Sequence, residues 1–443
     1  MPSYSLFEKF FLLCLFCVCY SAMAAEIGPK EAFQAALNFE PNYQAAVHQY
    51  QAEQKGVGIA RAGLLPSINL VANIDSDRDT QSSHRNGRST ETLVKYERQY
   101  YQATLRQPLI NLPAWYNYQQ EIERADSASQ SLQANKNQLL LDVVRAYVVS
   151  IYEDENISLS KALIKTLEAQ QLSAERQLAA GVGTVTDVYS AQSKKDIAEV
   201  DLLEAINRKE TSLRKLKLLS GLNFVGLKKI KRFDSALLPV LPLDELKSRA
   251  SLNNPNLALK KSEFEQTEYE LKKSRANFLP KLDFVALREN YNRYFNSFDD
   301  GSQTNRLGIE LSFPLFSGGR DFYRERQVAE LREKSKYDFQ AATSDLNNEL
   351  ENQYFLYANA ERKIKALRLA LQSSEHYAFA SKKSYEAGVR TLIDSLDADR
   401  QLYQARRDLA QSYLQYVLSW LQIGLLTGAV DDSQINMLDA LFG

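Results

Sequence analysis

Residues 61–72 read RAGLLPSINLVA and residues 275–286 read RANFLPKLDFVA, so one stretch of this chain occurs twice. Internal repeats of this kind indicate one structural unit used more than once. Other matching residues follow in the same order and at nearly the same spacing. They are Leu37-Asn38 with Leu252-Asn253, Pro41-Asn42 with Pro255-Asn256, Pro108-Leu109 with Pro314-Leu315, and Ala180-Gly181-Val182 with Ala387-Gly388-Val389. The repeat predicts two halves of about 200 residues that share one fold.

The first residues are typical of a secretory signal peptide. Lys9 precedes an apolar run over residues 10–20, and Ala22-Met23-Ala24 places small residues before a cleavage site. The run is too short to span a membrane as a helix. All three cysteines, Cys14, Cys17 and Cys19, lie inside it. We therefore predict a signal peptide over residues 1–24 and neither disulfide nor thiolate chemistry in the rest of the chain.

Composition favours a helix-rich protein and gives no sign of catalysis. The formal net charge is −1, with 25% charged and 44% hydrophobic residues. Near-neutral charge gives no reason to expect a nucleic-acid partner. The three histidines, His48, His84 and His376, are far apart and outside any metal-ligand spacing. We therefore expect no cofactor, no metal and no enzyme activity.

Each half contains two segments in which apolar and polar residues alternate. Ile68, Leu70, Ala72 and Ile74 alternate with polar neighbours in the first half, and Leu307, Ile309, Leu311 and Phe313 do so in the second. Shorter alternating segments occupy residues 101–106 and 282–287. Period-two alternation predicts strands, and segments of about 10 residues suit the wall of an outer-membrane barrel. Alternation alone favours a half-buried sheet of a soluble protein instead. The polar stretches 77–97 and 296–305 are predicted as surface loops.

The remaining sequence predicts very long helices. No proline or glycine interrupts residues 115–178 or 321–386, and each segment as a helix would measure roughly 95 to 100 Å. Apolar or small residues recur every seventh position, which is coiled-coil spacing. Both segments end in Ala-Gly-Val and reverse into a second helix, at 185–220 and 391–427. Shorter helices are predicted at 29–62 and 244–276.

Four strands per chain cannot close a barrel. The smallest outer-membrane barrels use about eight strands, and lipid does not tolerate an open sheet edge. If these strands lie in a membrane, the chain must contribute them to a barrel shared between several copies.

Three stretches then point to a known family. Residues 385–403 (YEAGVRTLIDSLDADRQLY), 181–188 (GVGTVTDV) and 311–319 (LSFPLFSGG) resemble the two hairpin turns and a strand-to-helix junction of the TolC family of outer-membrane channel proteins. The resemblance extends over essentially the whole chain after the signal peptide. It implies a mostly α fold with a transmembrane β component. In this fold, long helical hairpins of three copies form a periplasmic α-barrel tunnel, and four strands per chain form a shared 12-stranded barrel. The predicted divisions are repeats at 25–221 and 244–428, an equatorial segment at 222–243 and a tail at 429–443.

The resemblance also implies a gate at the hairpin tips. Gln170, Thr186, Asp187, Tyr385 and Arg390 match the residues that hold the tunnel shut. Asp394 and Asp397 match the carboxylates that ring the entrance, and their i, i+3 spacing puts both on one helical face. Without the family, Arg390 and Asp394 would be an ordinary surface pair. Tyr385 continues a seven-residue series and would be a core residue.

The predicted function is passive export through the outer membrane of a Gram-negative bacterium, with the tunnel extending into the periplasm. The resemblance implies a homotrimer in outer-membrane lipid, a periplasmic adaptor (membrane fusion) protein, and an inner-membrane ABC exporter or proton-driven pump. Type I protein secretion and tripartite drug efflux both stay open. A periplasmic coiled-coil scaffold without a pore is the alternative of a different class. The substrate and the translocase cannot be read from these residues.

Overall fold

The computed structural model describes residues 26–85, 87–230, 238–295, 299–428, 430 and 432–442. The predicted signal peptide, residues 1–24, lies outside the described residues. Parts of the predicted equatorial segment and of the predicted tail also lie outside them. The described ranges nevertheless contain nearly all of both predicted repeats.

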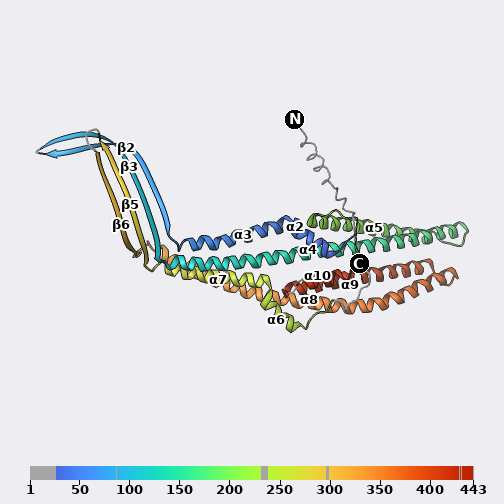
Figure 1. Ribbon diagram of the computed structural model, residues 1–443. Coiled ribbons are helices and arrows are strands. Elements are labelled where there is room, and N and C mark those ends of the chain that lie inside the picture. Colours follow the sequence, from blue (N-terminus) through green and yellow to red (C-terminus); the bar gives the residue numbers. More distant parts are fainter. Residues whose placement is uncertain are drawn as a thin grey trace, which may run out of the picture. The chain divides into compact units, whose positions relative to one another are not determined.

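The same series of helices and strands occurs twice along the chain (Figure 1). Each series starts with helices of 11 and 22 residues. Two strands follow, then a helix of 68 or 67 residues and a helix of 36 or 35 residues. The first series is α2 (Pro29–Phe39), α3 (Pro41–Ala62), β2 (Ser67–Arg85), β3 (Arg88–Ile110), α4 (Leu112–Ala179) and α5 (Val185–Ser220). The second is α6 (Leu243–Asn253), α7 (Pro255–Ala276), β5 (Lys281–Phe295), β6 (Asp299–Ser312), α8 (Arg320–Glu386) and α9 (Leu392–Leu426).

The chain divides into two compact units, and each unit takes segments from both series. The sheet unit comprises Ala46–Gln133 and Pro255–Asp345 and contains the four long strands. The hairpin unit comprises Ala134–Asn254 together with the described residues before Ala46 and after Asp345. It contains α5, α9 and the larger parts of α4 and α8. The compact units therefore differ from the sequence repeats, whose boundaries stay a prediction.

Proline divides each of the shorter helices, which the sequence analysis predicted as single helices at 29–62 and 244–276. The helical conformation is interrupted at Glu40 and Asn254, where ψ is 119° and 120°. The residue before a proline is disfavoured in the helical region, and Pro41 and Pro255 follow directly. The Glu40 carboxylate accepts a hydrogen bond from the Tyr43 N–H at 2.6 Å and so caps the start of α3. The prediction of single helices was wrong at these two positions.

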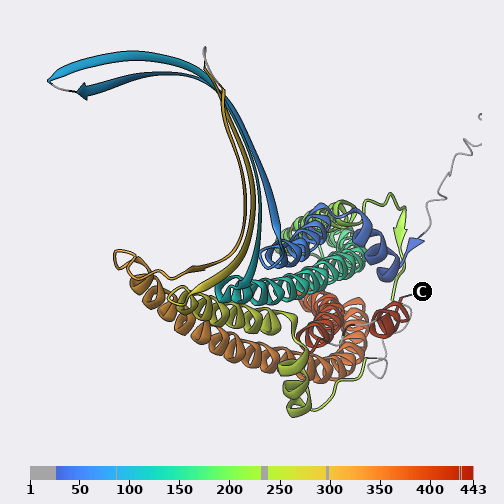
Figure 2. The same ribbon diagram turned by 60° about the vertical axis from the view of Figure 1, so that its left-hand side comes forward.

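The four long strands of the sheet unit form one antiparallel sheet in the order β2-β3-β5-β6. The central pair, β3 with β5, joins the two series, with Leu105 opposite Ala286. The register shifts at Pro108, which has no N–H to donate to the ladder. Figure 2 shows that the four strands curve in the same direction. In the described chain, β2 and β6 each pair on one side and so form the two edges of the sheet.

Residues 77–85 and 88–97 form strands and not the loop that the sequence analysis predicted. β2 continues to Arg85 and β3 begins at Arg88, with a turn at Gly87, whose φ is +77°. Arg98 bonds to Asp75 at 2.9 Å and Tyr96 donates to Asp79 at 2.8 Å across the two strands. Such cross-strand pairs stabilise a sheet even where neither face is apolar. Of the second predicted loop, residues 299–305 lie in β6, and residues 296–298 lie outside the described residues.

One face of the sheet carries exposed apolar side chains, which confirms the predicted alternation. Ile68 and Leu70 on β2 are 72% and 75% exposed, and Leu307 on β6 is 78% exposed. On the opposite face, Arg106 bonds to Asp283 at 2.6 Å and to Glu310 at 3.0 Å. A contiguous exposed apolar surface of this kind marks contact with a membrane or with another protein.

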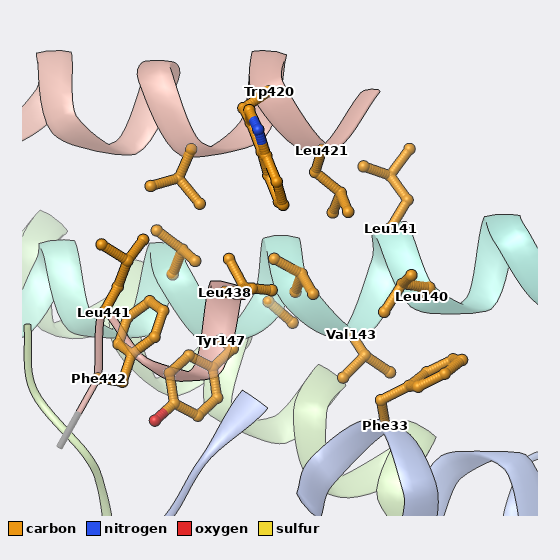
Figure 3. Close-up of a cluster of buried hydrophobic side chains, with 14 of the residues drawn as sticks. Phe33, Leu140, Leu141, Val143, Tyr147, Trp420, Leu421, Leu438, Leu441 and Phe442 are labelled. Atoms are coloured by element: carbon orange, nitrogen blue, oxygen red, sulfur yellow. The ribbon is translucent and has the colours of Figure 1, made fainter. Parts of the chain in front are cut away.

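The core of the hairpin unit includes the end of the chain (Figure 3). Tyr147 on α4 is fully buried, and its hydroxyl lies 2.8 Å from the carbonyl oxygen of Ile27 and 3.0 Å from that of Lys228. These two carbonyls belong to or adjoin the short strands β1 (Glu26–Ile27) and β4 (Gly226–Leu227). The Phe442 ring meets the Tyr147 ring edge-on, with centroids 5.2 Å apart. The segment predicted only as a tail thus contributes α10 (Asp432–Asp439) and buried apolar residues to the core.

Candidate functional site

The tips of the two helical hairpins have the same backbone construction. Residues 180–184 connect α4 to α5, and residues 387–391 connect α8 to α9. Gly181 and Gly388 have φ values of +74° and +69°, which residues with a Cβ rarely adopt. In each turn the next N–H bonds back to the carbonyl oxygen five residues earlier, at 3.0 and 2.9 Å. This pattern ends a helix. The predicted gate residues Thr186, Asp187, Tyr385 and Arg390 lie in or directly beside these two matching turns.

Each returning helix begins with a capping box that the sequence analysis did not identify. The Asp187 N–H donates to Thr184 Oγ1 at 3.2 Å, and Thr184 Oγ1 donates to Asp187 Oδ2 at 2.7 Å. Thr391 and Asp394 repeat both bonds at the same distances. The bonds from Thr391 hold the pKa of the Asp394 carboxyl below its ordinary value. The T-x-x-D spacing was a readable signal, because a capping box needs an acceptor at the cap and a partner three residues later.

The predicted gate residues of the second turn contact two different helices. Tyr385 is half-buried on α8, and its hydroxyl donates to Gln177 Oε1 on α4 at 3.0 Å. Arg390 is exposed, with its Nη1 3.3 Å from the Tyr377 hydroxyl and its guanidinium 5.6 Å from the centre of that ring. Tyr385 therefore joins the second hairpin to the first, whereas Arg390 contacts its own hairpin.

The first-turn residues Thr186 and Asp187 bond to neither Tyr385 nor Arg390 within the described ranges. Thr186 is exposed, and the carboxylate of Asp187 is engaged in its capping box. The predicted contacts between the two turns are therefore not formed inside one protomer. They stay a prediction for the assembled channel.

Gln170, the remaining predicted gate residue, bonds to an aspartate that the sequence analysis missed. Its Nε2 donates to Asp399 Oδ2 at 2.7 Å, which joins α4 to α9. Burial raises the pKa of the Asp399 carboxyl above its ordinary value, although the Gln170 bond and the charge of Lys382 act in the opposite direction. Asp399 lies seven residues after the buried Leu392, on the same face of the helix. A polar residue at such an apolar position was the sequence signal that could have identified Asp399.

The two predicted entrance carboxylates lie one turn apart on α9, as their spacing predicts. Asp397 forms an ion pair with Lys194 on α5, and its side chain is 59% exposed. Surface pairs of this kind contribute about 0–1 kcal/mol. One of the two carboxylates thus has a cation beside it that lies on another helix and could not be found from spacing. The ring itself needs several copies and stays a prediction.

A buried polar chain connects α9 to α4 and α5 farther from the tip. The Tyr403 hydroxyl donates to Asn156 Oδ1 at 3.2 Å and lies 3.0 Å from Ser160 Oγ. Asn156 in turn donates to Glu153 at 3.2 Å, and Arg208 donates to the same carboxylate at 2.8 Å. Buried groups that satisfy one another in this way fix how the helices fit together.

The described residues contain no group of three histidine, cysteine or acidic side chains that could hold a metal ion. Among the described helices, none combines the length and the apolar character needed to cross a membrane.

Comparison with known proteins gives the same family over both halves. The family model described as outer membrane efflux protein matches residues 32–222 and 246–429. The chain is 28% identical to the alkaline protease secretion protein AprF of Pseudomonas aeruginosa, over 95% of this chain and 88% of the relative. It is 28% identical to the proteases secretion protein PrtF of Dickeya chrysanthemi, over 95% of this chain and 92% of the relative.

A solved structure has the same fold. The outer membrane protein VceC of Vibrio cholerae matches with a TM-score of 0.77 at 16% identity, covering 90% of this chain and 96% of that chain. At this identity the likeness concerns the fold alone.

Proposed function

Because this chain belongs to the outer membrane efflux protein family, we propose that three copies of it form the outer-membrane conduit of a type I protein-secretion system. The chain is an outer-membrane channel protein of Gram-negative bacteria and not an enzyme. Two relatives that match over nearly the whole chain are named as secretion proteins for proteases. Their names support an exported protein as the substrate of this channel.

The observation that carries the proposal is the four-stranded sheet with two unpaired edges and one exposed apolar face. β2 and β6 each lack a neighbour on one side within the described chain, and Ile68 and Leu307 on these edges are 72% and 78% exposed. An apolar face suits lipid, whereas an unpaired edge in lipid would leave backbone groups without hydrogen bonds. Pairing β2 of one copy with β6 of the next removes both edges, and three copies close 12 strands.

The helical hairpins supply the periplasmic part of the proposed conduit. In this proposal the repeats at 25–221 and 244–428 each contribute one hairpin, so three copies line the tunnel with six. A periplasmic adaptor protein and an inner-membrane ABC exporter would dock on the assembly. Conduction is passive, because the energy for transport comes from the exporter.

The proposed gate consists of Gln170, Thr186, Asp187, Tyr385 and Arg390, with Asp394 and Asp397 around the entrance. The contact of Tyr385 with Gln177 supports a role at the tip, because it joins the two hairpins of one protomer. Contacts of Arg390 with Thr186 and Asp187 would then form between neighbouring protomers.

Deleting the gene tests the proposed function. The exported protein should disappear from the culture medium and return when the gene is supplied on a plasmid. The purified protein should be a trimer in detergent and should form conducting channels in planar bilayers. If the purified protein were a monodisperse monomer without detergent, the proposal that it forms an outer-membrane conduit would be wrong.

Drug efflux is the second candidate, because the family description itself names efflux. If efflux is the main function, deletion should increase drug susceptibility while protein secretion stays unchanged. A pore-free periplasmic scaffold is not adopted, because the chain belongs to a family of outer-membrane channels.

A further inference from the structure

A carboxyl group occupies an apolar position between the two hairpins. On α9 the residues Leu392, Leu396 and Tyr403 are buried, and Asp399 lies at the spacing that continues this row. Leu392 and Leu396 pack in one cluster with Leu167 of α4. A polar residue in such a row costs stability and is often retained because it determines how helices pair. Asp399 therefore needs an explanation beyond packing.

The partner of Asp399 leaves one hydrogen-bonding atom unused. Gln170 Nε2 donates to Asp399 Oδ2 at 2.7 Å. Gln170 Oε1 is buried and has no hydrogen-bond partner among the described residues. A buried acceptor that is left without a hydrogen bond destabilises the packed state. An ionised Asp399 cannot satisfy Gln170 Oε1, because a carboxylate has no proton to donate.

A protonated Asp399 can satisfy this atom. Asp399 takes up one proton from the solvent on Oδ1, and this O–H then donates a hydrogen bond to Gln170 Oε1, while the bond from Gln170 Nε2 to Oδ2 remains. We infer that Gln170 and Asp399, hereafter the acid–amide pair, form a proton-controlled contact that holds the second hairpin against the first. The inference rests on the proposed channel function in one respect, namely that separation of the hairpins at their tips opens the tunnel.

The charges around the pair leave Asp399 responsive to pH. Lys382 on α8 acts on it and favours the carboxylate. On α5, Lys194 is paired with Asp397. On α4 the facing group is the uncharged amide of Gln170. Burial outweighs these effects and raises the pKa of Asp399.

The sign of the pH effect follows from that direction. When the pKa of a carboxyl is raised in the packed state, its stabilisation is complete below the ordinary carboxyl range and is lost as pH rises through the raised value. The acid–amide pair should therefore hold the hairpins together at low pH and release them as pH rises through the raised pKa of Asp399. Lower pH would thus favour the closed channel.

The test is the pH dependence of single-channel conductance in planar bilayers, from about pH 3, below the ordinary range of an aspartate, to about pH 8. In the wild type, mean conductance should be lower at the acidic end. Asp399→Asn has no titration and can still exchange two hydrogen bonds with Gln170. Over the whole pH range, this variant should show the low conductance that the wild type shows at acidic pH. Gln170→Glu places two carboxyls together, which raises their pKa values, so the conductance change should move to higher pH.

Asp408→Asn is the matched control. Asp408 is a half-buried aspartate on the same helix, beside Arg407 and without contact to Gln170. This control should keep the wild-type pH profile. Asp394 and Asp397 are present in all four proteins, so the difference between the wild type and Asp399→Asn isolates the acid–amide pair.

A second measurement separates this inference from the proposed function. The thermal midpoint of the purified protein should fall with rising pH in the wild type more steeply than in Asp399→Asn. If no pore forms, the proposed function fails while this midpoint still tests the pair. If wild type and Asp399→Asn have the same pH profile in both measurements, the inference is wrong whether or not pores form.

Discussion

The two helical hairpins have nearly equal element lengths but bury different side chains. α5 buries small residues near the tip, with Ala191, Ala198 and Ala205 seven positions apart. α9 buries large residues in addition to small ones, and the large ones include Leu392, Leu396, Tyr403, Tyr416, Trp420 and Leu421. Small residues let helix backbones approach closely, and α5 does approach α9. Two hairpins with nearly equal element lengths thus pack in two different ways.

This difference in buried side chains indicates that different kinds of contact hold the two hairpins in place. Large apolar residues of α5 point away from the core, with Val200 and Leu203 56% and 62% exposed, and they are available to another copy in the proposed trimer. α9 is held by aromatic and aliphatic packing at its far end and by Leu392 and Leu396 at the tip. Between these two regions it is held by the polar contacts of Asp399 and Tyr403. Polar contacts can exchange partners without leaving a cavity. We therefore expect the tip of the second hairpin to be the mobile one.

The largest effect should come from the packed end of α9. Trp420 is 5% exposed, and its Nε1 donates to the Pro239 carbonyl at 3.4 Å. Trp420→Ala should lower the free energy of unfolding by about 3–5 kcal/mol, because it leaves a cavity in the core. Denaturant unfolding in detergent measures this loss. Leu203→Ala on the exposed face of α5 should leave the fold of the chain unchanged. If Trp420→Ala and Leu203→Ala lowered the free energy of unfolding equally, the proposed difference between the two hairpins would be wrong.

An intermediate effect is expected at Tyr403. Tyr403→Phe keeps the buried ring but leaves Asn156 Oδ1 without its donor, which should cost about 1–3 kcal/mol. The exposed Tyr189 on α5 provides the matched change, since Tyr189→Phe removes a hydroxyl that water can replace. The midpoints of thermal unfolding of the two variants measure the two losses of stability. A cost at Tyr403 no larger than at Tyr189 would show that the polar chain does not hold α9.

A smaller and equal effect is expected at the two caps. Thr184→Ala and Thr391→Ala each remove one capping box and should each cost about 1 kcal/mol. The pKa of Asp394 is lowered by Thr391, so its contribution is present above the ordinary carboxyl range and is lost as pH falls through the lowered value. The wild type should thus lose more stability on acidification than Thr391→Ala. Clearly unequal costs of the two substitutions at neutral pH would show that the turns are not equivalent.

The smallest effect on stability should accompany a large effect on the gate. Tyr385→Phe combined with Arg390→Ser removes contacts of a half-buried and an exposed side chain, which contribute little to folding. Trimer yield and thermal stability should stay near wild type. Resting conductance in planar bilayers should rise, and cells should admit large antibiotics such as vancomycin. Stable trimers with unchanged conductance would make Tyr385 and Arg390 ordinary coiled-coil residues.

The long helices and their turns could be predicted because their signals are local. The predicted helix at 115–178 is α4, Leu112–Ala179, and the one at 321–386 is α8, Arg320–Glu386. A helix continues where proline and glycine are absent, and each helix ends at the glycine of its turn. Both effects concern only the backbone within a few residues. The break at Pro41 was equally local and was overlooked.

The polar partners near the tips could not be predicted in this way. Asp399 bonds to Gln170 and Asp397 pairs with Lys194, partners more than 200 residues away in the chain. Which of several polar residues on a helix meets a given partner depends on the rotation and height of both helices. Spacing along one helix contains no information about either.

The sequence by itself determined the order of the elements, the twofold series, the alternating strands and the caps, because each depends on neighbours within one or two helical turns. Only the tertiary structure decided that β3 pairs with β5, that Leu438 and Phe442 near the end of the chain lie in the core, and that Asp399 meets a half-satisfied amide. These are contacts between distant segments, and their free energy depends on burial and on the shape of the packed helices. That information exists only after the chain has folded.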